Sequence, residues 1–253
     1  MVMDFQMKRL HNGILEFKIT RPEKRNAVNF EVMEGLSQAI ERAKETDIRA
    51  LVVTGEGEQA FCSGGDLSVF HALRTEGEAY RMLSKMGKIL HELTILPKPT
   101  IALINGTAVG GGCEIATACD FRIAKAGAKM GFIQGSLAIT TGWGGGTLLF
   151  ERIASYHALK LLSEAAIYRA EQLAHTGFVH RVVDRINEEV VERFLQNELT
   201  IHSSVLSAYK QIQIRKWASS DLWEKMDQEI KQCAILWEAE AHHEAVASFL
   251  NKK

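Results

Sequence analysis

Residues 105–114 read NGTAVGGGCE, and residues 60–67 read AFCSGGDL. Each stretch follows an apolar run that is typical of a strand, residues 100–104 and 50–54, and each leads into a segment with helical spacing. This alternation of strand, glycine loop and helix predicts a βαβ rhythm, and therefore an α/β fold.

The glycines of these two stretches favour a particular kind of site. A glycine has no Cβ, so a ligand can approach its backbone N–H closely. Two such turns, brought together, would direct two N–H donors at one oxygen, which is how an oxyanion hole is built. A helix beginning at Gly111 would add the positive end of its dipole.

The composition is that of an ordinary globular protein. The 253 residues are 46% apolar and 24% charged, with a formal net charge of −1. Basic residues are dispersed and no apolar run approaches the ~20 residues of a membrane span, so we expect neither a nucleic-acid partner nor a membrane. Residues 1–5 lack the pattern of a signal peptide, and we expect a cytoplasmic protein.

The four cysteines are Cys62, Cys113, Cys119 and Cys233. They form no CxxC pair and no histidine cluster has zinc spacing, so we expect no metal site and reduced cysteines in the core. Cys62 and Cys113 flank the glycine loops, which leaves a nucleophilic role open. However, neither has a nearby histidine in sequence to generate a thiolate.

The rest of the chain divides into an α/β core and a helical C-terminal part. Asn12-Gly13 between two apolar runs predicts an N-terminal hairpin. Helical spacing is found over residues 30–44 and 76–96, and, beyond residue 155, in most of the chain to residue 249. We place a core domain at residues 1–190 and a helical region at 191–253. The apolar stripe of residues 222–249 fits either core packing or a subunit contact.

Known nucleotide fingerprints are missing. Gly110-Gly111-Gly112 lacks the G-x-G-x-x-G spacing, and no P-loop lysine follows either glycine run. The glycine turn at 142–146 fits either a phosphate cradle or close helix packing, and we favour packing.

Taken together, several short motifs resemble the crotonase, or enoyl-CoA hydratase/isomerase, superfamily. Their order and spacing along nearly the whole chain carry the resemblance. In chain order they are RPEKRNAV (21–28), FCSGGDL (61–67), PKPTIA (97–102), GGGCE (110–114), CDFRIA (119–124) and the glycine turn at 142–145.

The resemblance implies a spiral of ββα repeats, closed by C-terminal helices that form a homotrimer or a hexamer of two trimers. It implies an acyl-CoA thioester as substrate, so coenzyme A enters with the substrate and no separate cofactor is expected. Gly65 and Gly111 would hold the thioester oxygen, which becomes an enolate. The substrate-binding residues that it implies are Lys24, Arg25, Ala27, Ser63, Gly64, Asp66, Leu67, Gly110 and Trp143. Asp66 also fits a helix N-cap, the role we favour.

The resemblance breaks at one catalytic position. Hydratases of this superfamily use two glutamates; Glu114 matches the first, and Gln134 stands where the second is expected. An amide does not transfer protons at neutral pH. The missing acid argues against efficient hydration, because a general acid or base typically contributes ~10²–10⁴-fold.

Three functions remain open. Decarboxylation of a malonyl-CoA-type substrate needs mainly the enolate, and the segments 119–122 and 143–145 are similar to the ethylmalonyl-CoA decarboxylase branch. The second is an enoyl-CoA hydratase or isomerase of fatty-acid metabolism that uses Glu114 alone. The third is an acyl-CoA binder without turnover. We favour the decarboxylase.

Overall fold

The computed structural model describes residues 3–251, so residues 1–2 of the N-terminal segment considered above lie outside it. Two β-sheets form its centre. The larger has the order β1 (Phe5–Arg9), β2 (Ile14–Ile19), β3 (Ala50–Gly55), β5 (Thr100–Ile104), β7 (Phe121–Lys125), β10 (Arg181–Val183). The smaller has the order β4 (Ala60–Cys62), β6 (Thr107–Val109), β8 (Lys129–Gly131), β9 (Tyr168–Arg169). Neighbouring strands are parallel except in the pairs β1–β2 and β8–β9.

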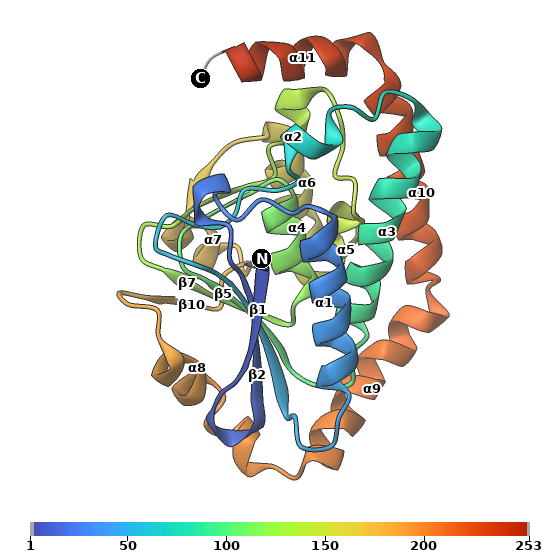
Figure 1. Cartoon of the computed structure of the whole chain (residues 1–253). Helices are drawn as coiled ribbons and strands as arrows, with labels where there is room; N and C mark the ends of the chain where they lie inside the picture. The colour runs from blue at the N-terminus through green and yellow to red at the C-terminus, as the bar shows by residue number, and fades with distance from the viewer. Residues whose placement is uncertain (1–2, 252–253) are drawn as a thin grey trace.

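The helices surround these sheets (Figure 1). They are α1 (Phe30–Ala43), α2 (Leu67–Phe70), α3 (Glu76–Thr94), α4 (Gly111–Ala118), α5 (Gly145–Arg152), α6 (Ser155–Glu164), α7 (Ala170–His175), α8 (Glu188–Phe194), α9 (Ser203–Ser219), α10 (Leu222–Glu238) and α11 (Glu240–Asn251). Single 3₁₀ turns lie at His11–Gly13, Pro22–Lys24, Gln134–Leu137 and Glu198–Thr200. Among residues 3–251, no helix has both the length and the apolar character that crossing a bilayer requires.

From β3 to β8, successive strands alternate between the two sheets. β3 and β4 belong to different sheets, as do β5 and β6, and β7 and β8, and each pair is followed by helix. This is the spiral of ββα repeats that the resemblance implies. The domain boundary at residue 190 stays a prediction.

The two glycine stretches contain more structure than the sequence indicates. We expected a loop directly after each predicted strand, but each stretch contains a three-residue strand of the smaller sheet, β4 or β6. These strands are parallel neighbours, and Cys62 pairs with Ala108. The glycine turns at their carboxyl ends are therefore adjacent in space.

Local signals explain most element boundaries. Asn12 and Gly13 adopt the left-handed conformation that the hairpin turn requires. The side chain of Asn29 caps α1 through the N–H of Val32, and Thr75 opens α3 in a capping box with Glu78. β8 is short and ends at Gly131.

Most of the C-terminal stripe is core, although Phe249 near its end is 43% exposed. Met226, Ile230 and Cys233 of α10 are fully buried, and α10 runs along α3 (Figure 1). A Cβ added to Gly87 of α3 would lie 2.3 Å from Cδ1 of Ile230, so the two helices are in tight contact. The predicted continuous helix 222–249 is wrong at Ala239, whose extended backbone separates α10 from α11. After this break, α11 crosses the end of the molecule that carries α2 (Figure 1).

A buried ion cluster fixes α9 to this core. The carboxylate of Asp120 accepts hydrogen bonds from Lys210 of α9 and from both the N–H and the hydroxyl of Thr100. Arg152 of α5 lies 3.4 Å from the same carboxylate and covers the Trp217 ring. The cations and the carboxylate are all nearly excluded from solvent, so removing one partner would leave an uncompensated buried charge.

Candidate active site

A cavity of about 720 Å³ lies where the glycine turns, the 3₁₀ turn at Gln134–Leu137 and the C-terminal helices meet. Its wall includes every site residue predicted from the sequence. These are Lys24, Arg25, Ala27, Ser63, Gly64, Gly65, Asp66, Leu67, Gly110, Gly111, Glu114, Gln134 and Trp143. The fold thus brings the predicted residues together, while their individual roles remain predictions.

The first glycine turn is held on one side by Val28. The N–H of Val28 donates to the carbonyl of Gly64, and the N–H of Asp66 donates to the carbonyl of Val28, both at 2.8 Å. In this parallel bridge Gly65 faces Val28, but its own N–H makes no bond to it. Gly64 has φ +95°, a backbone conformation that glycine adopts without strain.

The second glycine turn leads into α4. The N–H of Gly110 donates to the carbonyl of Gly131 at 2.9 Å, and the carbonyl of Gly110 accepts from Cys113 and Glu114. Gly111 is therefore the first residue of the helix, where backbone N–H groups lack intrahelical acceptors.

The two turns touch. A Cβ added to Gly64 would lie 3.2 Å from the nitrogen of Gly111. Within residues 3–251, neither Gly65 nor Gly111 donates its N–H to a protein acceptor. Two unused donors thus lie on adjacent turns at the cavity wall, the arrangement that an oxyanion site requires.

Trp143 packs against both glycine turns. A Cβ on Gly111 would lie 2.1 Å from Cζ3 of the indole, and one on Gly65 would lie 3.7 Å from Cζ2. The ring is 4% exposed and lines the cavity. Trp143 is therefore both a part of the core and a wall of the cavity.

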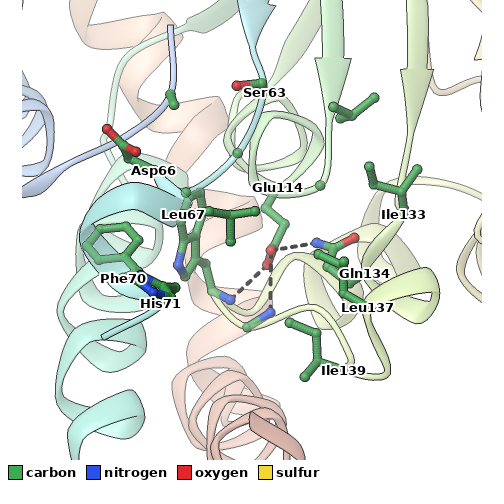
Figure 2. A pocket seen from close by; sticks show the side chains of 18 of the residues that line it. Ser63, Asp66, Leu67, Phe70, His71, Glu114, Ile133, Gln134, Leu137 and Ile139 are labelled. Carbon is green, nitrogen blue, oxygen red and sulfur yellow. Dashed lines mark hydrogen bonds between the residues drawn. The ribbon is translucent and has the colours of Figure 1, made fainter. Parts of the chain in front are cut away.

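Glu114 is 2% exposed, and N–H donors surround its carboxylate (Figure 2). Its Oε2 accepts from the backbone of Trp143 at 2.8 Å and of Gly145 at 2.9 Å. Its Oε1 accepts from the side-chain amide of Gln134 at 2.9 Å and has a longer contact, 3.4 Å, with the N–H of Gly142. Oε2 is thus held by two short bonds and Oε1 by only one.

Burial has the largest effect on the pKa of Glu114. Loss of hydration, together with the nearby carboxylate of Glu229, raises the pKa of Glu114 from its ordinary value of 4.5 to about 7, although the backbone N–H bonds oppose this shift. An acid with this pKa can both give and take a proton near neutrality.

Gln134 is placed beside Glu114, as the sequence predicts. It lies at the start of the 3₁₀ turn, is 8% exposed, and donates its amide to Glu114. Its Oε1 is buried without a hydrogen-bond partner among the described residues. The segment 134–143 supplies no second carboxyl group.

Asp66 has the capping role that we favoured. Its Oδ1 accepts from the N–H of Ser68 at 3.0 Å, and Asp66 is the N-cap of α2. Its Oδ2 pairs with Arg21 at 2.8 Å in a buried contact. Arg21 and Ser68 hold the pKa of Asp66 below its ordinary value against the opposing effect of burial. The carboxylate lines the cavity but already has structural partners.

The mouth of the cavity carries two cations. Lys24 is the last residue of the 3₁₀ turn Pro22–Lys24. Arg25 follows it as the C-cap, with φ 52°. The N–H of Ser63 donates to the carbonyl of Arg25 at 3.1 Å, which ties this turn to the end of β4. The cations are therefore next to the first glycine turn.

The cysteines are free and buried, as expected. Burial raises the pKa of Cys62 and of Cys113 to about 12, so both thiols are protonated at neutral pH. This ionisation argues against either thiol as a nucleophile.

Part of the cavity was not predicted. Met82 and Leu83 of α3, Ile139, and Cys233 and Trp237 of α10 line it with apolar surface. The helical stripes were visible in the sequence, but nothing local shows which members of a stripe face a cavity. Glu229 was also missed, because a single glutamate on a helix usually lies on a solvated face.

Comparison with known proteins identifies the family of this chain. The family model for enoyl-CoA hydratase/isomerase matches residues 9–253. A short-chain-enoyl-CoA hydratase of Clostridium acetobutylicum is 29% identical over 96% of both chains. An ethylmalonyl-CoA decarboxylase of Xenopus tropicalis is 35% identical over 70% of this chain and 59% of its own length.

Solved structures show the same fold. An enoyl-CoA hydratase from Bacillus halodurans superposes with a TM-score of 0.85 and 23% identity, covering 97% of this chain and 99% of the other. With the family match over nearly its whole length, the chain belongs to the enoyl-CoA hydratase/isomerase, or crotonase, superfamily of acyl-CoA enzymes.

Proposed function

We propose that this enzyme decarboxylates a malonyl-CoA-type thioester through an enolate held by the N–H groups of Gly65 and Gly111. The observation that carries the proposal is the pairing of Glu114 with Gln134, an amide, at 2.9 Å. The acid/base centre has one carboxyl group in contact with an amide where a hydratase of this superfamily has two acids. A reaction that needs one proton donor fits this centre best.

The proposed step balances with Glu114 as the acid. The electron pair of the bond between C2 and the carboxylate passes into the thioester, CO₂ leaves, and the oxygen becomes an enolate on the two N–H groups. C2 then takes the proton of Glu114 and the thioester carbonyl re-forms. We assign the proton to Oε1, because Oε2 is held by two short N–H bonds. Solvent returns the proton afterwards.

The remainder of the cavity supports a CoA thioester. Lys24 and Arg25 supply positive charge for the phosphates at the mouth, and Ala27 and Ser63 lie beside them. Apolar surface from Leu83, Ile139 and Trp237 suits the acyl group and disfavours a charged carboxylate, which favours loss of CO₂. The proposal requires no separate cofactor.

A second candidate is hydration of an enoyl-CoA by Glu114 alone. It is favoured by the similarity to the Clostridium acetobutylicum hydratase along 96% of both chains. Gln134 would then orient a water for Glu114 without exchanging a proton.

One assay separates these functions. Purified enzyme is incubated with methylmalonyl-CoA, ethylmalonyl-CoA and crotonyl-CoA, and the thioester products are followed by mass spectrometry. We expect decarboxylated products from the malonyl-type thioesters. Hydration of crotonyl-CoA alone would establish the second candidate, and tight binding without any turnover would identify a binder.

Glu114→Gln is the matched variant for this assay. Removing the acid should lower the decarboxylation rate on the order of 10²–10⁴-fold, while affinity for the product thioester changes little. An unchanged rate would show that Glu114 is structural.

We also propose that the chain forms a homotrimer, alone or paired as a hexamer. Val205, Tyr209 and Ile212 repeat on one face of α9 and are 43%, 66% and 57% exposed. Apolar groups exposed along one helix face mark an association surface. Sedimentation equilibrium distinguishes trimer from hexamer, and a monomer would contradict the proposal.

A further inference from the structure

A second carboxylate, on a partly buried side chain, lies next to the loop that binds Glu114. Glu229, on α10, accepts hydrogen bonds from the N–H of Gly146 at 3.0 Å and of Thr147 at 2.6 Å. These residues follow directly after Gly145, whose N–H donates to Glu114. Nothing in the proposed step uses Glu229.

The backbone N–H groups of the loop 141–147 therefore bind two different carboxylates, those of Glu114 and Glu229. Gly142, Trp143 and Gly145 bind Glu114, and the next two N–H groups bind Glu229. The side chains of Thr141 and Thr147 favour the ionised form of Glu229 and so lower its pKa, against the effect of burial. The position of every donor to Glu114, apart from Gln134, thus depends on a loop that α10 holds through Glu229.

The contacts leave no spare room in this loop. A Cβ on Gly145 would lie 2.3 Å from Cγ of Glu114, and one on Gly146 would lie 3.2 Å from Oε1 of Glu229. Gly144, between the two sets of contacts, has φ +83°. The backbone of this loop therefore approaches both carboxylates closely.

We propose that Glu229 is a positioning residue that orients the loop 141–147 around Glu114 and, as a second carboxylate on the same loop, favours the protonated form of Glu114. The inference deepens the proposed function, because it names the group that tunes the acid of that reaction.

Electrostatics agrees with this geometry. The nearby charge of Glu229 raises the pKa of Glu114, and burial raises the pKa of Glu229 itself. The other titratable groups near Glu114 are the thiols of Cys113 and Cys233, and burial keeps both protonated. Glu229 is thus the charged neighbour of Glu114.

The decisive measurement is a ¹³C NMR titration of protein labelled at the glutamate carboxyl carbons, with Glu114→Gln assigning the resonance. Glu229→Gln keeps the size of the side chain and removes its charge. We expect the pKa of Glu114 to fall by about one unit in this variant. Glu224→Gln, which removes an exposed charge from the same helix, is the control and should leave Glu114 unchanged.

Two further variants separate the effect of the negative charge of Glu229 from the effect of its hydrogen bonds to the loop. Glu229→Asp keeps the charge but shortens the reach, so it should lower the thermal unfolding midpoint and retain the raised pKa of Glu114. Thr147→Val removes a hydroxyl that favours the ionised form of Glu229, with little change in volume. It should shift Glu114 in the same direction as Glu229→Gln by a smaller amount, and it tests the inference even if Glu229→Gln does not fold.

An unchanged pKa of Glu114 in folded Glu229→Gln, or in Thr147→Val where Glu229→Gln does not fold, would overturn the inference. The titration needs no substrate, so it remains decisive if the protein turns over none of the thioesters above. Where turnover is found, the fall of kcat/KM at alkaline pH should move to lower pH with the same variant, since Glu114 must be protonated to act as the acid.

Discussion

The two halves of the candidate active site are built in different ways. The oxyanion half comes from residues 60–67 and 105–114, two glycine turns that end neighbouring parallel strands. The acid half is assembled from Gln134, the loop 141–147 and Glu229, together with Glu114. The first half needs backbone and small residues, which a short sequence can specify. The second depends on segments more than a hundred residues apart.

This comparison predicts that adding a side chain to a glycine of the oxyanion half, which we also call the glycine half, causes a steric clash and a loss of activity. In Gly111→Ala, the new Cβ would overlap the Trp143 ring at 2.1 Å, so the indole or the turn must move. We expect a loss of activity on the order of 10²–10³-fold, as for loss of one oxyanion donor, and about 1–3 kcal/mol of stability. Steady-state kinetics and urea unfolding measure the two effects.

Gly77→Ala is the matched control. A Cβ there meets only the end of Arg81, at 3.9 Å, in the first turn of α3. Stability should stay the same or rise slightly, because alanine favours helix. Equal losses in both variants would contradict the assignment of Gly111.

The acid half should instead make the free energy of unfolding depend on pH. Between pH 4.5 and about 7, native Glu114 keeps a proton that the unfolded chain has released. Unfolding in this range therefore releases a proton. The contribution of Glu114 to the free energy of unfolding is complete below pH 4.5 and falls by about 3 kcal/mol as the pH rises to 7.

Urea unfolding of the enzyme and of Glu114→Gln at pH 4.5 and 7.5 isolates this effect. The difference in the free energy of unfolding between the two proteins should change by that amount. A difference independent of pH would mean that the pKa of Glu114 is the same in the native and the unfolded protein.

A smaller effect on activity is expected when an acid is placed at position 134, where a hydratase of this superfamily has its second glutamate. Gln134→Glu puts a carboxyl group at the position of an amide that lies 2.9 Å from Glu114. Hydration of crotonyl-CoA should rise on the order of tenfold, part of the usual contribution of a general acid. The two carboxyls would share a proton and destabilise the fold at high pH. No gain from a folded variant would show that the missing acid does not limit hydration.

The smallest effect concerns the glycine half again. Cys62→Ala should leave kcat/KM within about twofold, because a thiol with a pKa of about 12 is not a nucleophile at neutral pH. The same steady-state assay measures it. A loss on the order of a hundredfold would assign the thiol a direct role.

Much of the fold was predictable because its signals are local. The hairpin at Asn12-Gly13, the caps at Asn29 and Thr75, and the buried strands each have a recognisable pattern. β4 and β6 were not found, because three-residue strands next to glycine show no period. The break at Ala239 has no proline or glycine to mark it. It coincides with a contact between His242 of α11 and the carbonyl of Leu137, at 2.7 Å.

The sequence by itself determined the α/β class, the two glycine turns and the residue types at positions 114 and 134. These follow from spacing and from the absence of a Cβ, which are properties of short segments. Only the tertiary structure decided that the turns lie side by side, that Trp143 wedges against both, and that Glu229 holds the loop around Glu114. Such contacts depend on how helices dock on the sheets, and burial in that docked state gives Glu114 a pKa that no isolated segment would have.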